Sequence, residues 1–206
     1  TVLFSFYACA RSPGRPDGDA PFPCRWGPRL AGCRLATRRH GLCAAAPFFG
    51  GLERIFGEGL IGKKVGAHIV APTIPESVFF LFQLSFAIIT FALVLGATAE
   101  RMRLGVTIVF AALWSTLIYA PVAHWVWHPE GWLAQQGHMD FAGGTVVHIT
   151  SGVSGLVAAW VLGPRRGFGK EPMVPHNLLI TVLGAGLLWV GWFGFNAGSA
   201  FEASAR

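Results

Sequence analysis

By length alone, 206 residues would suit one or two soluble domains, but 53% hydrophobic and only 13% charged residues indicate a membrane protein. Most of the net charge of +6 comes from residues 1–45, where seven Arg stand against two Asp. No basic stripe accompanies the apolar segments, so the composition does not support a nucleic-acid partner.

The first segment, residues 1–47, has neither a helical nor a strand period and holds all four cysteines among Arg, Gly and Pro. The cysteine spacing does not match a zinc site, although an exported segment could form disulfides. No basic stretch precedes an apolar core, as a signal peptide requires. We interpret this leader as disordered, or as sequence of doubtful reading frame standing where membrane spans are expected.

A Gly-rich stretch, residues 48–72, predicts an extramembrane loop that leads into the apolar part of the chain. Four uncharged stretches follow, each within the roughly 17–25 residues that a helix needs to cross the hydrocarbon core. They are residues 77–99, 104–127, 141–163 and 178–201. The predicted fold class is therefore an all-α polytopic membrane protein. The last two spans are rich in Gly, Ala, Ser and Thr, which predicts close helix packing.

The loops between the spans predict their orientation, because Lys and Arg gather on the cytoplasmic side. Residues 100–103 and 164–170 are basic, whereas residues 128–140 hold no Lys or Arg. Two crossings separate the basic loops, so both lie on one side. We expect a multi-pass protein of the cell membrane whose first span runs from outside to inside.

Depth along the spans brings candidate functional residues to similar levels. Counted at about 1.5 Å per residue, Phe86 lies ~14 Å, His148 ~10 Å and Phe195 ~9 Å below the outer surface. Nearer that surface lie an indole, a carboxylate and a hydroxyl: Trp127, Asp140 and Ser199. The sequence therefore permits a funnel in which a small solute meets these polar groups, two Phe close the path and a His follows.

The aromatic residues also have structural interpretations. Phe82 and Phe86, spaced i and i+4, are typical of packing or lipid-facing rings, and Trp127 is typical of an interfacial aromatic belt. His148 differs, because an ionisable group inside a bilayer is costly and favours a functional role.

The polar and small residues are ambiguous in the same way. Asp140 directly precedes an apolar helix, which is typical of an N-cap. Ser199 would satisfy a backbone carbonyl, and Gly194 and Gly198 would allow close helix packing.

Five sequence blocks stand out in and beside the spans: residues 82–90 (FQLSFAIIT), 99–102 (AERM), 119–127 (YAPVAHWVW), 140–149 (DFAGGTVVHI) and 191–199 (GWFGFNAGS). Together they resemble the ammonium transporter family, Amt/MEP/Rh. The last two blocks are long and specific, and the order and spacing of all five agree with the family. On this resemblance we assign residues 48–206 to an ammonium transporter membrane domain.

The resemblance implies a homotrimer in which each subunit has its own pore and eleven spanning helices arranged as an inverted repeat. This chain would supply part of the first half, roughly the third to sixth helices. The ligand would be ammonium or ammonia, with no cofactor or metal. In bacterial relatives a PII signalling protein closes the cytoplasmic mouth, which the loop 164–177 faces here.

Roles for individual residues also follow from the resemblance. Phe86, Trp127 and Ser199 match the outer ammonium site. The gate matches Phe86 and Phe195, with Phe82 beside it. The pore histidine and the acidic residue that shapes the site or assists deprotonation match two further residues: His148 and Asp140.

Three functions remain open. The first is an ammonium transporter, of which this chain, ending at Arg206 before a second pore histidine, would be an incomplete fragment that does not transport alone. The second is an ammonium sensor on the same membrane core, or a truncated copy without function. The third is a membrane enzyme with a metal held by four histidines: His124, His128, His138 and His148. Of these only His124 and His128 are spaced i and i+4 on one helix, and we expect no enzyme activity.

Overall fold

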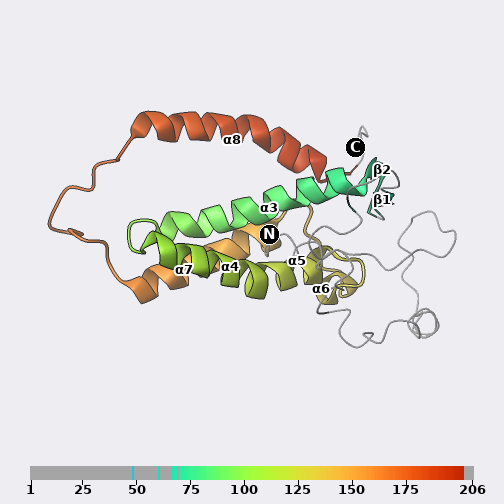
Figure 1. Cartoon of the computed structure of the whole chain (residues 1–206), viewed down its shortest axis with the longest axis horizontal. Helices are drawn as coiled ribbons and strands as arrows, with labels where there is room; N and C mark the ends of the chain where they lie inside the picture. Colours follow the sequence, from blue (N-terminus) through green and yellow to red (C-terminus); the bar gives the residue numbers. More distant parts are fainter. Residues whose placement is uncertain (1–47, 49–59, 61–65, 69, 202–206) are drawn as a thin grey trace.

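The computed structural model describes residues 48, 60, 66–68 and 70–201, so the predictions for the leader 1–47 lie outside the described residues. The elements in chain order are β1 (Ala67–His68), β2 (Ala71–Pro75), α3 (Glu76–Thr98), α4 (Leu104–Trp114), η3 (Ser115–Tyr119), α5 (Ala120–Trp127), α6 (Trp132–Gln135), η4 (Gly144–Ile149), α7 (Thr150–Leu162) and α8 (Leu178–Gly198). Figure 1 shows α3, α4, α5 and α7 bundled together, with α8 set apart from them.

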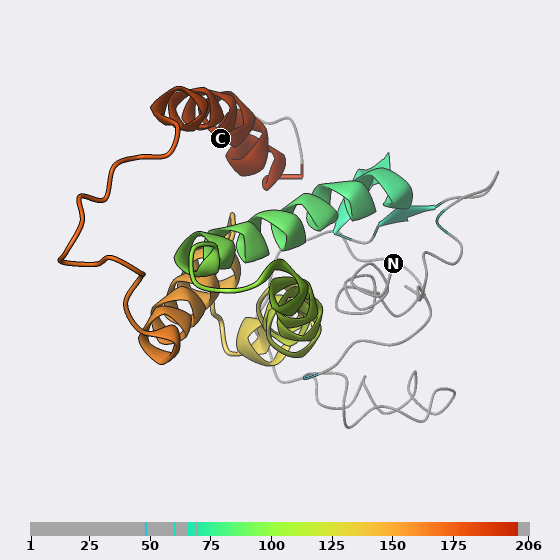
Figure 2. The ribbon, with the colours of Figure 1, turned by 60° about the vertical axis from the view of Figure 1, so that its left-hand side comes forward.

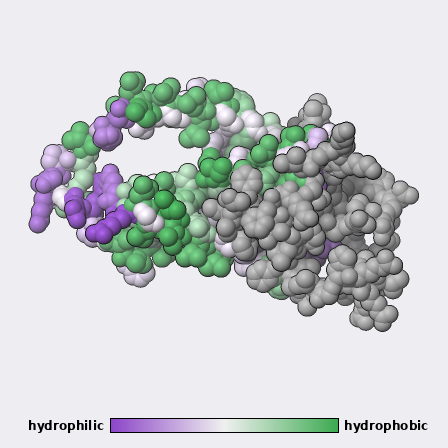
Figure 3. All heavy atoms as spheres, in the orientation of Figure 1, coloured by the Kyte–Doolittle hydropathy of each residue, from purple (hydrophilic) through white to green (hydrophobic). Residues whose placement is uncertain are grey.

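Within the described residues, four helices are long and apolar enough to cross a membrane, which confirms the predicted spans. α3 is the first, α4 continues through η3 into α5 as the second, η4 continues into α7 as the third, and α8 is the fourth. Large apolar side chains cover their outer surfaces; Trp160, for example, is 83% exposed. Figure 3 shows this apolar cover on the helices and hydrophilic residues on the loop between α7 and α8.

The prediction of a loop over residues 48–72 was wrong at its end, where β1 and β2 form an antiparallel pair. Strands of two and five residues, the second with a Pro at each side of its centre, carry too little periodic signal to be seen in the sequence. The backbone N–H of Glu76 then donates to Gly66 O at 2.9 Å, which ties the start of α3 to this hairpin.

Two π-helical segments, which the sequence did not predict, interrupt the second and third spans. η3 ends two residues before Pro121, whose ring would clash with the carbonyl four residues back in a normal α-turn. A wider turn at this point keeps the span continuous. In η4 the carbonyl of Gly143 accepts hydrogen bonds from the N–H groups of Val147 at 2.9 Å and His148 at 3.1 Å.

Asp140 and Gly143 together set the start of η4. The Asp140 carboxylate accepts hydrogen bonds from four backbone N–H groups, those of Gly143 (2.6 Å), Gly144 (2.8 Å), Thr145 (2.8 Å) and Val146 (2.9 Å). The predicted cap is therefore confirmed, although the chain turns through Gly143 at φ 97° before the helix begins. This turn is why the third span begins at 144 rather than at 141.

α3 lies at the centre of the bundle and packs along α7. A Cβ added at Gly155 of α7 would lie 3.4 Å from Ala97 Cβ of α3, so the two backbones approach closely, as predicted for the third span. Trp114 Nε1 donates to Ser154 Oγ at 2.9 Å, which joins α4 to α7. The buried side chains between these helices include Val94, Tyr119 and Val146.

The fourth span departs from the predicted close packing. No residue of α8 is buried among the described elements, and a Cβ added at Gly194 would meet nothing within 4 Å. Figures 1 and 2 show the reason: α8 runs antiparallel to α3, and the C-terminal end of α8 is the part that comes near α3. There a Cβ at Gly198 would lie 2.8 Å from Phe82 Cε2, so Gly198 does allow a close approach.

The two basic loops lie at the same end of the bundle, as predicted from the charge pattern (Figure 1). Arg165, after α7, forms an ion pair with Glu100, after α3, at 2.7 Å. Arg101 Nη1 donates to Ala159 O and Gly163 O, each at 3.1 Å.

Replacing Gly143 with Ala is expected to destabilise the protein by more than about 1–2 kcal/mol, the usual cost of the left-handed backbone for a residue with a Cβ. The added Cβ would also lie 2.6 Å from Val147 Cγ2. Gly144→Ala is the matched control, because a Cβ there meets nothing within 4 Å. Thermal unfolding in detergent should show a lower midpoint for Gly143→Ala alone, and equal midpoints would contradict this account of the turn.

Candidate functional site

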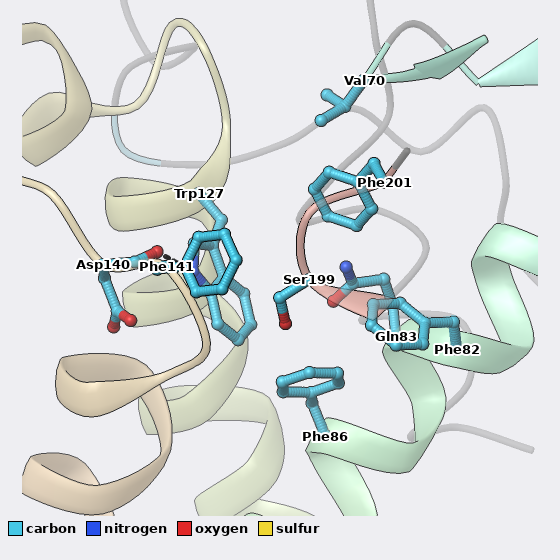
Figure 4. A pocket seen from close by; sticks show the side chains of 9 residues that line it. All are labelled: Val70, Phe82, Gln83, Phe86, Trp127, Asp140, Phe141, Ser199 and Phe201. Atoms are coloured by element: carbon cyan, nitrogen blue, oxygen red, sulfur yellow. Dashed lines mark hydrogen bonds between the residues drawn. The ribbon is translucent and has the colours of Figure 1, made fainter. Parts of the chain in front are cut away.

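A cavity of about 180 Å³ lies where the start of α3, the end of α5, the segment before η4 and the end of α8 meet (Figure 4). The lining residues are Val70, Phe82, Gln83, Phe86, Trp127, Asp140, Phe141, Ser199 and Phe201. Space of this size is enough for a small cation with several water molecules. The tertiary structure thus brings together most of the residues that depth along the spans had placed near one another.

Phe86 is the centre of an aromatic cluster at one end of this cavity. Its ring stacks on Phe195 of α8 with centroids 4.2 Å apart and an interplanar angle of 29°. It meets Trp127 edge to face at 5.4 Å and Phe82 at 5.0 Å. Phe86 is only 2% exposed, so its position is determined by packing on several sides. Phe86 thus lines the cavity and also contacts Phe195 of α8.

Trp127 and Ser199 are both oriented by hydrogen bonds to backbone carbonyls. Trp127 Nε1 donates to Asp140 O at 2.9 Å, which fixes the indole plane beside the cavity. Ser199 Oγ donates to Phe195 O at 2.8 Å, as its structural interpretation predicted. Because this bond uses the hydroxyl proton, Ser199 presents oxygen lone pairs to the cavity, where it lies facing Phe86 (Figure 4). The site can therefore accept hydrogen bonds from a donor.

Asp140 lines the cavity, but its carboxylate is used elsewhere. Both carboxylate oxygens accept hydrogen bonds from the backbone at the start of η4. Figure 4 shows the carboxylate pointing away from Ser199, on the other side of Trp127. Asp140 thus positions Trp127 and η4, and its negative charge lies behind the cavity wall.

His148 lies beyond the stacked Phe pair, at the end of a row of rings. Phe195 stacks on Trp192 with centroids 4.6 Å apart at 18°, and Trp192 meets the His148 ring at 5.9 Å and 35°. The His148 side chain is exposed among the described residues. Phe86, Phe195, Trp192 and His148 therefore follow one another as a continuous row of rings. The sequence placed the cavity, the Phe pair and the histidine in this order but did not predict Trp192.

Sequence reasoning also missed several lining residues. Gln83 is 2% exposed and places an amide among the aromatic rings. A polar side chain within an apolar span was a usable signal, because such residues are costly in lipid and usually face a bundle interior. Val70, Phe141 and Phe201 gave no comparable signal, since apolar residues beside the ends of spans are common.

The four histidines considered for a metal enzyme do not converge on one point. His124 and His128 stack with centroids 4.6 Å apart, His138 is 3.0 Å from Thr145 Oγ1, and His148 contacts Trp192. In the part of the chain that the structure describes, no three His, Cys, Asp or Glu side chains are arranged to hold a metal ion.

Known proteins of one family are similar to this chain. A model of the Ammonium Transporter Family matches residues 48–206. An ammonium transporter of Bacillus subtilis (strain 168) is 53% identical over 151 residues, which cover 73% of this chain and 36% of that protein. A putative ammonium transporter of Methanothermobacter thermautotrophicus is 48% identical over 175 residues, covering 79% of this chain and 42% of the relative.

The fold is also found in a solved structure. The crystal structure of Saccharomyces cerevisiae Mep2 aligns with a TM-score of 0.67 and 41% sequence identity, covering 77% of this chain and 35% of Mep2. The chain thus spans between about a third and two fifths of the length of these proteins. The match over residues 48–206 and the level of identity place this multi-pass membrane chain in the ammonium transporter family, a family of transporters rather than enzymes.

Proposed function

We propose that the protein conducts ammonium or ammonia across a cell membrane and that the cavity between Phe86, Trp127 and Ser199 recruits the ion from the outer side. The observation that carries this proposal is the combination of aromatic rings and a hydroxyl acceptor in one cavity, with the stacked Phe86–Phe195 pair beside it. Aromatic rings attract a cation by about 0.5–2 kcal/mol each. The hydroxyl lone pairs favour a cation that can donate hydrogen bonds, which K⁺ cannot do.

Beyond the cavity, the aromatic row makes passage of a full charge expensive. Phe86, Phe195 and Trp192 offer aromatic ring faces along this row, and an unpaired ion loses most of its hydration among such rings. Desolvation favours the neutral form, so ammonium gives up its proton to water in the cavity beside the Phe pair and continues as ammonia. His148, at the end of the row, then accepts or donates a hydrogen bond to the neutral molecule.

The remaining expectations belong to the same proposal. The chain forms one part of a pore in a homotrimer, its four spans supplying one wall. The loops that carry Arg101 and Arg165 face the cytoplasm, and a PII-type regulator binds on that side. The exposed apolar flanks of α8 are consistent with cover by further apolar segments.

The hydroxyl of Ser199 provides a direct test of recruitment. Methylammonium uptake is measured in cells that lack their own ammonium transporters and express the full-length protein that contains these four spans. Ser199→Ala removes an acceptor for a charged donor and is expected to raise the half-saturating concentration about tenfold. Ser85→Ala is the matched control, since Ser85 Oγ also donates to a carbonyl of its own helix, at 2.6 Å from Phe82 O, but does not line the cavity. Equal effects of the two variants, or no uptake by the wild type, contradict the proposal.

Asp140→Asn tests whether Asp140 acts by shaping the site. The amide has one oxygen in place of two, so some of the four backbone N–H groups lose their acceptor, at about 1–3 kcal/mol for each group left buried and unpaired. We expect a lower unfolding midpoint in detergent together with reduced uptake. Glu171→Gln, in the exposed loop before α8, should change neither. Uptake lost at an unchanged midpoint would instead assign Asp140 an electrostatic role.

A further inference from the structure

The inner end of α7 is held by a side chain from outside the helix. Arg101 follows the end of α3, and its Nη1 donates at 3.1 Å to both Ala159 O and Gly163 O. Ala159 O also accepts from the Gly163 N–H at 3.1 Å, so Arg101 adds a second hydrogen bond there and another at the final carbonyl, Gly163 O. A cation at this end also interacts favourably with the helix dipole. Arg101 is half-buried, so these bonds are partly shielded from water.

At the outer end of the same continuous helix the roles are reversed: the Asp140 carboxylate accepts hydrogen bonds from the N–H groups at and just before the start of the helix. Each capping residue is in turn bonded to another span. Asp140 O accepts from Trp127 of α5 at 2.9 Å. The Arg101 N–H donates to Thr98 O, at the end of α3, at 2.9 Å. The helix 144–162 is thus anchored at one end to α5 and at the other to α3.

The contact between α3 and α7 by itself does little to prevent one helix from sliding along the other. Where they approach, Gly155 lies against Ala97, with a Cβ-to-Cβ separation of 3.4 Å if Gly155 carried a Cβ. Small residues allow close approach but interlock little, so sterics there oppose axial sliding weakly. The other link at this end, the ion pair of Arg165 with Glu100, has side chains 34% and 65% exposed and adds little.

Sliding of α7 along α3 would alter the candidate pore, because α3 carries Phe86 and the helix 144–162 carries His148. We propose that Arg101 is a positioning residue that fixes the axial register of α7 on α3 and thereby the place of His148 behind the Phe86–Phe195 pair. Its effect on transport rests on the proposed function, whereas its effect on register does not.

The register is tested by disulfide cross-linking, which needs no transport. Ala97→Cys and Gly155→Cys place two thiols near the roughly 3.5–4.5 Å Cβ separation of a disulfide. In membranes treated with a mild oxidant, the pair should cross-link about tenfold more slowly when combined with Arg101→Ala, because two hydrogen bonds from a charged group are lost. Arg103→Ala, an exposed Arg of the same loop, is the control and should leave the rate unchanged. Equal rates for the two Arg variants would overturn the proposal.

Transport provides the second readout. Arg101→Ala should lower the maximal rate of methylammonium uptake per folded molecule about tenfold, with a much smaller change in the half-saturating concentration, which the cavity determines. Oxidation of the Cys pair should restore the rate in this variant, and the same oxidant should not help Arg101→Ala without the pair. A loss that the disulfide does not restore, or equal changes in rate and half-saturation, would count against positioning.

The two hypotheses fail in different ways. A wild type without uptake ends the proposed function, but the cross-linking comparison still decides the role of Arg101. A wild type with uptake and unchanged Arg101→Ala kinetics and cross-linking ends the positioning role alone. Where Arg101→Ala yields too little folded protein, Arg101→Gln, which keeps an amide donor but lacks the charge and the reach, takes its place in both assays.

Discussion

The acceptance of four backbone N–H groups by the Asp140 carboxylate is the interaction on which the site depends. It begins the third span within a few residues of a left-handed glycine and satisfies N–H groups that would otherwise be unpaired at a helix start. The carbonyl of Asp140 also orients Trp127. One residue therefore fixes both the plane of the indole and the start of η4, the helix that carries His148. A carboxylate suits this task because it accepts several bonds and complements the positive end of the helix dipole.

The same arrangement separates charge from the path of a ligand. The Asp140 carboxylate accepts hydrogen bonds from backbone amides, whereas rings, an amide and a hydroxyl are among the other groups that line the cavity. Rings attract a cation weakly and without fixed directionality, so they suit a site that must release its ion as well as bind it. Beyond Phe86 the stacked rings continue to Trp192, and the environment changes within a few ångströms from partly polar to aromatic. In the proposed function, this change favours loss of the ammonium proton.

α3, α4 and α7 are joined both by close packing of small residues and by hydrogen bonds from polar side chains. Small residues bring α3 and α7 into close contact, and hydrogen bonds from Trp114 and Arg101 add specific attachment points. In lipid, apolar surfaces gain little by leaving solvent, so packing and such bonds determine how spans sit on each other. α8 differs, because it carries an apolar surface and glycines but contacts the bundle at one end, where Phe195 stacks on Phe86 and Ser199 lines the cavity.

The sequence by itself determined the four spans, the common side of the basic loops and the capping role of Asp140, because hydropathy, loop charge and capping depend on neighbours in the chain. Depth along the spans also placed Phe86, His148 and Phe195 at similar levels. Only the tertiary structure decided which rings stack, that Trp192 lies between Phe195 and His148, and that the Asp140 carboxylate turns away from the cavity. Those facts depend on how each helix is rotated about its axis, and in segments apolar on all sides the sequence leaves that rotation undetermined. It is set by contacts between residues far apart in the chain.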